Sequence, residues 1–207
     1  MKNVYLMGDS QRMRYQPEVT RLLKDEAKVL YPGYVAEVEA GETSVENVNG
    51  RWSGFTLNSL VPHLWLKNLP KLDVVHWNNG IWDLVIRFQE DGPFTPIDQY
   101  ETNVRRIIRE MKKLCPVFLI ATTTPPRPDV RRHPVSGEVS MTLTNVKRYN
   151  EVLWRIAEEQ NIPVNDLFSL VMQNRELYLR EDDEVHLSEE GVKVCGKQTA
   201  DFIRKYL

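Results

Sequence analysis

This sequence of 207 residues has only two cysteines, no long hydrophobic run and no large excess of charge of one sign. Its two cysteines, Cys115 and Cys195, are too few for a disulfide framework and are not spaced like zinc ligands. No stretch approaches the roughly 18 apolar residues of a membrane helix, and no apolar signal segment follows Met1. We therefore expect a cytoplasmic protein with no membrane partner.

Charge and length narrow the class of protein further. The 27 basic and 29 acidic residues nearly cancel, and no basic stripe is present, so nucleic acid is not an expected partner. His63, His76 and His133 have no ligand spacing with one another, so no metal site is expected. The length suits a single domain over residues 1–207, and the sequence does not fix its oligomeric state.

The hydrophobic pattern predicts strands alternating with helices. The expected strands are residues 3–7, 34–38, 72–77, 117–121 and 162–164, and the expected helices are residues 17–28, 55–66, 96–114, 144–159 and the segment after Ser188. The proline-containing stretch 125–140 is expected to be a lid or binding loop. Such alternation predicts an α/β fold with a parallel sheet covered on both faces.

The first expected strand ends in Gly8-Asp9-Ser10. Glycine permits a sharp turn, and a serine on a tight strand-to-helix turn exposes its hydroxyl at the carboxyl end of the sheet, where open α/β sheets bind ligands. Ser10 is therefore a candidate nucleophile. The alternative is that Ser10 only caps a helix.

A serine nucleophile needs a general base, and the base needs a partner that fixes its tautomer. His186 and Asp183 lie three residues apart before the last expected helix, so one loop can present both groups. Two alternatives remain open: an ordinary surface loop, and a metal-dependent hydrolase that uses the same two residues.

The motifs taken together resemble the SGNH (GDSL-type) hydrolases. The matching blocks are Gly8-Asp9-Ser10, Gly54, Gly80-Ile81-Trp82-Asp83 and Asp183-Glu184-Val185-His186. The resemblance implies a flavodoxin-like three-layer α/β/α fold with about five parallel strands in the order 2-1-3-4-5. It also implies that Ser10 is the nucleophile, His186 the base and Asp183 its partner. The oxyanion hole would contain the backbone N–H groups of Ser10 and Gly54.

The third block departs from the family pattern because Trp82 stands where the family has an asparagine. That asparagine normally donates to the oxyanion, and an indole cannot replace its amide there. The block is similar to a variant in PC-esterase-type proteins in which an earlier asparagine is constant, so Asn78 is favoured over Asn79. Gln11, where the family often has leucine, is interpreted as a harmless change.

The resemblance implies a serine esterase that needs no metal or organic cofactor and acts on a small-molecule or carbohydrate ester. We expect it to remove a short acyl group, acetyl from a carbohydrate, with Trp52, Trp82 and Arg12 contacting the substrate. The alternative within the same class is a lysophospholipase or acyl-thioesterase. The alternative from another class is a non-catalytic carbohydrate-binding domain on the same fold.

Overall fold

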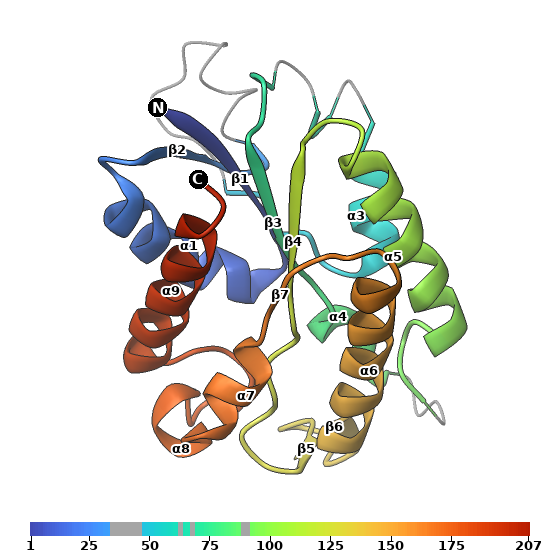
Figure 1. The fold of residues 1–207 in the computed structure, drawn as a ribbon. Coiled ribbons are helices and arrows are strands. Elements are labelled where there is room, and N and C mark those ends of the chain that lie inside the picture. Colours follow the sequence, from blue (N-terminus) through green and yellow to red (C-terminus); the bar gives the residue numbers. More distant parts are fainter. Residues whose placement is uncertain (34–46, 62–63, 67–68, 88–91) are drawn as a thin grey trace.

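A five-stranded parallel sheet in the order β2-β1-β3-β4-β7 forms the centre of the computed structural model, which describes residues 1–33, 47–61, 64–66, 69–87 and 92–207 (Figure 1). The strands are β1 (Lys2–Gly8), β2 (Ala27–Leu30), β3 (Val74–Asn78), β4 (Val117–Ala121) and β7 (Val164–Asn165). This confirms the expected parallel sheet and its order. Because all five strands are parallel, their carboxyl ends lie at one edge, which is the lower edge in Figure 1.

Helices cover both faces of the sheet, as the alternating pattern predicts. One layer contains α1 (Ser10–Leu23) and α9 (Glu189–Arg204), and the other contains α3 (Ser53–Ser59), α5 (Ile97–Met111) and α6 (Leu143–Glu159). Three shorter helices are α4 (Ile81–Leu84), α7 (Leu167–Met172) and α8 (Arg175–Tyr178). The architecture is therefore three-layered α/β/α.

Side-chain alternation along β1 explains the two hydrophobic cores. Val4 and Leu6 are buried with α1 and α9, whereas Tyr5 and Met7 are buried with α5 and α6. Successive residues of a strand point to opposite faces, so a strand covered on both faces is apolar throughout. The first strand therefore lies in the middle of the molecule and ends beside the other strand ends.

The first helix begins earlier than residue 17, where the sequence pattern placed its start. The Asp9 carboxylate accepts a hydrogen bond from the backbone N–H of Gln11 at 3.0 Å and caps a helix that starts at Ser10. Pro17 lies inside this helix on its exposed side. The helix ends at Leu23, and the second strand is Ala27–Leu30, which the sequence pattern had assigned partly to the helix. The expected strand over 34–38 lies outside the described residues.

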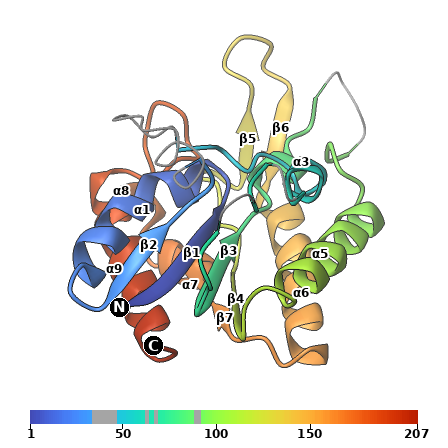
Figure 2. The same ribbon diagram turned by 90° about the horizontal axis from the view of Figure 1, so that it is seen from above.

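A β-hairpin replaces the expected loop over 125–140. Strands β5 (Val130–Arg132) and β6 (Val139–Thr142) are antiparallel, and Figure 2 shows them projecting beyond the body of the molecule. A backbone hydrogen bond of 2.9 Å from the N–H of Ile86 to the carbonyl of Ser140 joins the hairpin to the segment after α4. The hairpin therefore stands at the carboxyl edge of the sheet.

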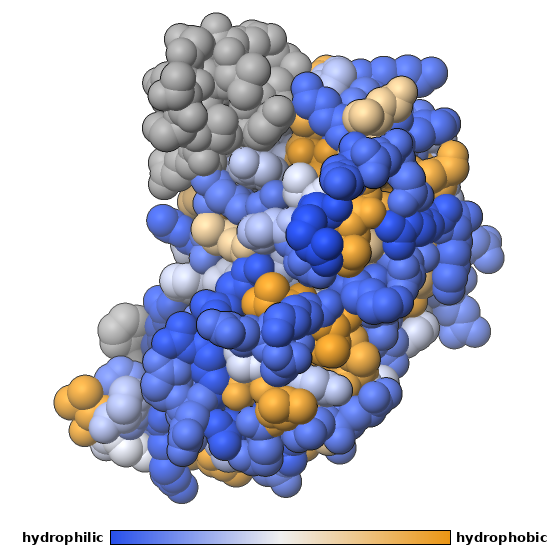
Figure 3. Space-filling model, turned by 90° about the vertical axis from the view of Figure 1, so that its left-hand side faces the viewer, coloured by the Kyte–Doolittle hydropathy of each residue, from blue (hydrophilic) through white to orange (hydrophobic). Residues whose placement is uncertain are grey.

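The surface over α1, α8 and α9 is mostly hydrophilic, with hydrophobic residues in small separate groups (Figure 3). Within the described ranges, none of the helices combines the length and the apolar character needed to cross a membrane.

Candidate active site

The turn after β1 requires glycine and places Ser10 at the start of a helix. Gly8 has φ +151°, and a Cβ atom there would lie 2.3 Å from the carbonyl oxygen of Asn78. Only glycine lets the two strand ends approach so closely. Ser10 is the first residue of α1, where backbone N–H groups have no carbonyl partner within the helix. The turn thus places the Ser10 hydroxyl and the first backbone N–H groups of α1 at the sheet edge.

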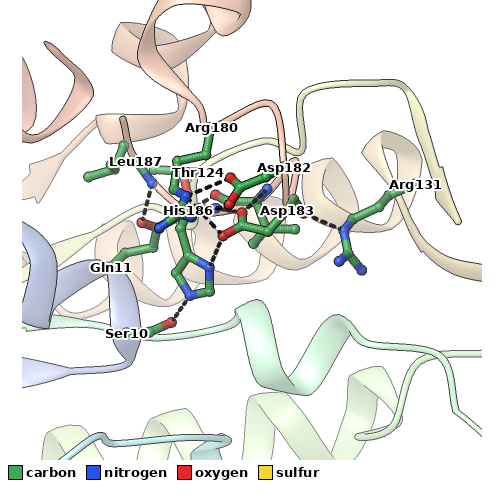
Figure 4. Close-up of polar contacts among 10 residues, drawn as sticks. Ser10, Gln11, Thr124, Arg131, Arg180, Asp182, Asp183, His186 and Leu187 are labelled. Atoms are coloured by element: carbon green, nitrogen blue, oxygen red, sulfur yellow. Dashed lines mark hydrogen bonds and ion pairs between the residues drawn. The ribbon is translucent and has the colours of Figure 1, made fainter. Parts of the chain in front are cut away.

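His186 meets Ser10 from the opposite end of the chain (Figure 4). The distance from His186 Nε2 to Ser10 Oγ is 2.8 Å, and that from His186 Nδ1 to Asp183 Oδ2 is 3.0 Å. All three side chains are partly buried. The three residues singled out from the sequence are therefore within hydrogen-bonding distance in the order that proton transfer from serine requires.

The Asp183 carboxylate is held by its own loop. Its Oδ1 accepts hydrogen bonds from the backbone N–H groups of His186, at 2.8 Å, and Val185, at 3.0 Å. Burial raises the pKa of Asp183, but these backbone bonds and the nearby His186 outweigh it, so the net shift is downward. The guanidinium of Arg131 donates to the Asp183 carbonyl at 2.9 Å from the hairpin. Asp183 is thus a charged acceptor fixed beside the imidazole.

Gln11 joins the serine turn to the histidine loop, a role that sequence analysis missed when it interpreted this residue as harmless. Its buried amide nitrogen donates to the carbonyl of Val185 at 2.6 Å, and its amide oxygen accepts from the N–H of Leu187 at 3.2 Å. These are the two residues that flank His186. A leucine could make neither bond. Gln11 therefore fixes the backbone on both sides of the imidazole.

Asp83 fixes the segment that contains Gly54. Its carboxylate accepts hydrogen bonds from Ser53 N at 2.9 Å and Ser53 Oγ at 2.6 Å. Asn103 also donates to Ser53 Oγ at 3.0 Å. Gly54 follows in the first turn of α3, where helical geometry again leaves backbone N–H groups without a carbonyl partner. Asp83, in the third motif, thus fixes the position of Gly54, the second motif.

Two buried carboxylates lie beneath the site. Asp9 accepts from Gln11 N and, at 3.4 Å, from Ile81 N, and burial raises its pKa to about 7. Burial likewise raises the pKa of Asp83 to about 6. The oxygens of both carboxylates accept hydrogen bonds from backbone N–H groups, and these bonds link separate segments of the chain. These contacts assign them to the framework of the site.

Asn78 and Asn79 differ in their partners. Asn78 ends β3 and is 1% exposed, and neither polar atom of its side chain has a hydrogen-bond partner in the part of the chain that the structure describes. A Cβ atom on Gly8 would lie 3.0 Å from Asn78 Oδ1, so this amide lies against the serine turn. Asn79 instead donates to Asp83 Oδ2 at 3.2 Å. A buried amide without a partner costs stability, which is expected of a group reserved for a ligand.

Of the three residues expected to contact substrate, Trp82 lines the cavity beside Ser10, whereas Trp52 and Arg12 do not. Trp82 lines a cavity of about 430 Å³ together with Ser10 and His186. Trp52 does not line it and packs against Gly54, where a Cβ atom would lie 2.9 Å from Trp52 Nε1. Arg12 is 0% exposed, and its guanidinium donates to the side chain of Asn47 and the carbonyl of Val48.

The burial of the Arg12 side chain argues against the expected contact of Arg12 with substrate. Burial also lowers the pKa of Arg12 to about 10. Over residues 1–33, 47–61, 64–66, 69–87 and 92–207, no three His, Cys, Asp or Glu side chains are grouped so that they could hold a metal ion.

The parallel sheet between two helical layers, with the serine turn after its first strand, is the SGNH hydrolase fold. The family model of the GDSL-like lipase/acylhydrolase family matches residues 7–194, so the chain belongs to this family. It is an ester-hydrolysing enzyme, and the alternative of a non-catalytic binding domain is not retained.

Relatives agree with this assignment. A GDSL esterase/lipase of Arabidopsis thaliana is 26% identical, and the match covers 76% of this chain and 69% of the relative. The crystal structure of an acetyl xylan esterase, AlAXEase, superposes with a TM-score of 0.70 at 17% identity, covering 97% of this chain and 99% of the other. A lipase/acylhydrolase from Enterococcus faecalis gives 0.71 at 17% identity, covering 99% and 96%. These structures establish a shared fold.

Proposed function

We propose that this chain is a serine esterase that removes a short acyl group, acetyl from a carbohydrate, through an acyl-enzyme intermediate. The observation that carries the proposal is the continuous pair of contacts from Ser10 Oγ to His186 Nε2, at 2.8 Å, and from His186 Nδ1 to Asp183 Oδ2, at 3.0 Å. These contacts open onto the cavity of about 430 Å³.

In the first step, Ser10 Oγ attacks the ester carbonyl while His186 Nε2 takes its proton. Asp183 accepts from His186 Nδ1 and stabilises the imidazolium that forms. Negative charge develops on the carbonyl oxygen. The proposed donors to this oxygen are the backbone N–H groups of Ser10 and Gly54 and the side-chain amide of Asn78.

In the second step, the tetrahedral intermediate collapses and the bond between the acyl carbon and the alcohol oxygen breaks. His186 returns the proton to that oxygen, and the alcohol leaves. Water then attacks the acyl-Ser10 ester with His186 as the base. The acid leaves and the Ser10 hydroxyl is restored, so protons balance over the cycle without a cofactor.

The residues that line the cavity indicate which substrates it can bind. Trp82 offers an aromatic face of the kind on which sugars stack, and the structural neighbour AlAXEase is described as an acetyl xylan esterase. On the other hand, Ile81, Val85, Met141 and Val185 give the same cavity an apolar side. That side favours the second candidate, a lipase or thioesterase that binds a longer acyl chain.

A chain-length series of esters tests the two candidates. We expect 4-nitrophenyl acetate to have the highest kcat/KM or close to it, and the octanoate to be at least about 10-fold lower. A deep acyl pocket would instead gain about 0.8 kcal/mol for each CH₂ that it buries, so that kcat/KM would climb steeply with chain length. The series should run from acetate to decanoate beside acetylated sugars. A preference for octanoate or for a long-chain acyl thioester would replace the carbohydrate assignment with the lipase–thioesterase one.

The side-chain donor to the oxyanion is tested with Asn78→Ala. Because the proposed contact forms only in the transition state, kcat should fall by about 10²- to 10³-fold with little change in KM. Asn79→Ala is the matched control, since the Asn79 amide already donates to Asp83, and its effect on kcat should be smaller. Steady-state kinetics on an acetate ester give both parameters. Equally small effects of the two changes would leave the proposed hole without a side-chain donor.

A further inference from the structure

A second cavity adjoins the one that contains Ser10. We call the cavity of Ser10 and His186 the inner cavity, and the second one, of about 610 Å³, the outer cavity. Both are lined by Val85, Arg87 and Arg131, and the outer cavity continues along the β5–β6 hairpin. A ligand that reaches from one cavity into the other must pass the two arginines.

The position of His186 indicates which part of an ester extends toward the hairpin. His186 must give its proton to the departing alcohol oxygen, so the alcohol lies beside the loop that carries His186. Arg131 is attached to that same loop, because its Nε donates to the carbonyl of Asp183 at 2.9 Å (Figure 4). The alcohol portion of the substrate therefore faces Arg131 and the outer cavity, and the acyl group lies elsewhere in the inner cavity.

The two arginines at this junction keep their charge available. Arg131 donates to an uncharged carbonyl and to Ser140 Oγ, and Arg87 stacks 5.5 Å from the Trp82 ring and 5.1 Å from the Phe94 ring. Within the described ranges, neither guanidinium is paired with a carboxylate.

Three other arginines do have carboxylate partners: Arg127 with Glu176, Arg175 with Asp129, and Arg180 with Asp182. Stacking on aromatic rings orients a guanidinium without neutralising it. One carboxylate, that of Glu138, also lines the outer cavity, where it accepts a hydrogen bond from Ser136 Oγ at 3.2 Å.

We propose that the outer cavity binds the alcohol portion of the substrate and that Arg87 and Arg131 recognise an anionic group on it, a carboxylate or a phosphate. Planar guanidinium groups match the geometry of both oxyanions. The inference rests on the proposed esterase function and narrows its substrate to an ester of an acidic alcohol, such as an acidic sugar.

Four acetate esters of phenols that differ in one para substituent, which is anionic, neutral or cationic, test this proposal. They are 4-acetoxybenzoate, its neutral counterpart 4-acetoxybenzamide, 4-acetoxyphenyl phosphate and (4-acetoxyphenyl)trimethylammonium. The readout is kcat/KM for each charged ester divided by that for the amide, corrected for the rate of hydroxide hydrolysis. Wild type should favour one of the two anions by at least about 10-fold, and the preferred anion identifies carboxylate or phosphate.

Arg87→Glu should lower the anion-to-neutral ratio by at least about 10-fold, and Arg87→Gln by less, because only the former reverses the charge. Any general loss of activity divides out of the ratio. Arg106→Glu is the matched control, since Arg106 is exposed on α5 and lines neither cavity, and its ratio should equal that of wild type. An unchanged ratio in Arg87→Glu would overturn the proposal. So would a wild-type preference for the trimethylammonium ester, which would point to Glu138.

Binding separates this inference from the proposed function. Calorimetric titration of Ser10→Ala with the uncleaved esters requires no turnover, and here too the anionic ester should bind at least about 10-fold more tightly than the amide. If wild type hydrolyses none of the esters but this preference is present and is lost with Arg87→Glu, the proposed function fails and the anion site stands. If the amide ester is hydrolysed in a Ser10-dependent manner without any charge preference, the anion site fails alone.

Discussion

Ser10→Ala should lower kcat for acetate esters on the order of 10⁶-fold, the loss that follows removal of a serine nucleophile in other triads. The methyl group cannot form the acyl-enzyme, and His186 Nε2 loses the hydroxyl that lies 2.8 Å away. The residual rate should come from the proposed oxyanion hole and from binding alone. Pre-steady-state assays with 4-nitrophenyl acetate in excess over enzyme should show no burst of 4-nitrophenol.

Two controls keep this result interpretable. Ser169→Ala makes the same change at an exposed serine of α7 outside the active-site cavity and should keep full activity. Circular dichroism and the melting temperature should show that Ser10→Ala remains folded, because the helix cap is provided by Asp9. A folded Ser10→Ala protein that retains a tenth of the wild-type rate would exclude Ser10 as the nucleophile.

The second large effect is expected from Asp183→Asn, with a loss of about 10⁴-fold in kcat. The asparagine oxygen can still accept from the backbone N–H groups of Val185 and His186, so the loop keeps its shape. The new NH₂ group then faces His186 Nδ1 and makes that atom an acceptor. The imidazole proton moves to Nε2, where it blocks proton transfer from Ser10.

Asp182→Asn is the matched control because it makes the same change one residue earlier. Asp182 is exposed and its carboxylate is paired with Arg180. Its replacement should change kcat by less than about 2-fold, as expected for a surface ion pair. Comparable losses in the two variants would mean that the loop, rather than a carboxylate beside His186, determines the rate.

The alternation of apolar runs with helical periodicity predicted a parallel sheet covered on both faces. The strand order and the pairing of Ser10 with His186 were predicted from the resemblance of four short motifs to the SGNH hydrolases, because periodicity alone does not order the strands. The role of Gln11 was missed for a different reason. Its two bonds reach Val185 and Leu187, and no periodic pattern reports which distant backbone atoms a side chain will meet.

Arg12 and the β5–β6 hairpin were also mispredicted, because in both cases the structure depends on contacts between distant parts of the chain. An arginine near a nucleophile is ordinarily exposed, but tertiary contacts with Asn47 and Val48 bury this one. Strands β5 and β6 are only 3 and 4 residues long and lie in a stretch with several prolines, so their sequence is typical of a loop. Pairing between them and the bond from Ile86 to Ser140, both properties of the folded chain, define the hairpin.

The proposed nucleophile, Ser10, is synthesised near the start of the chain and the proposed base, His186, near its end. Helix α1, which begins at Ser10, and helix α9, which follows His186, lie side by side in the folded molecule (Figures 1 and 2). Ser10 leaves the ribosome early, whereas His186 follows more than 170 residues later and is held by a loop that precedes α9. Helix α9 also covers the hydrophobic face that contains Val4 and Leu6. A growing or clipped polypeptide that ends before residue 186 therefore contains the proposed nucleophile without the proposed base.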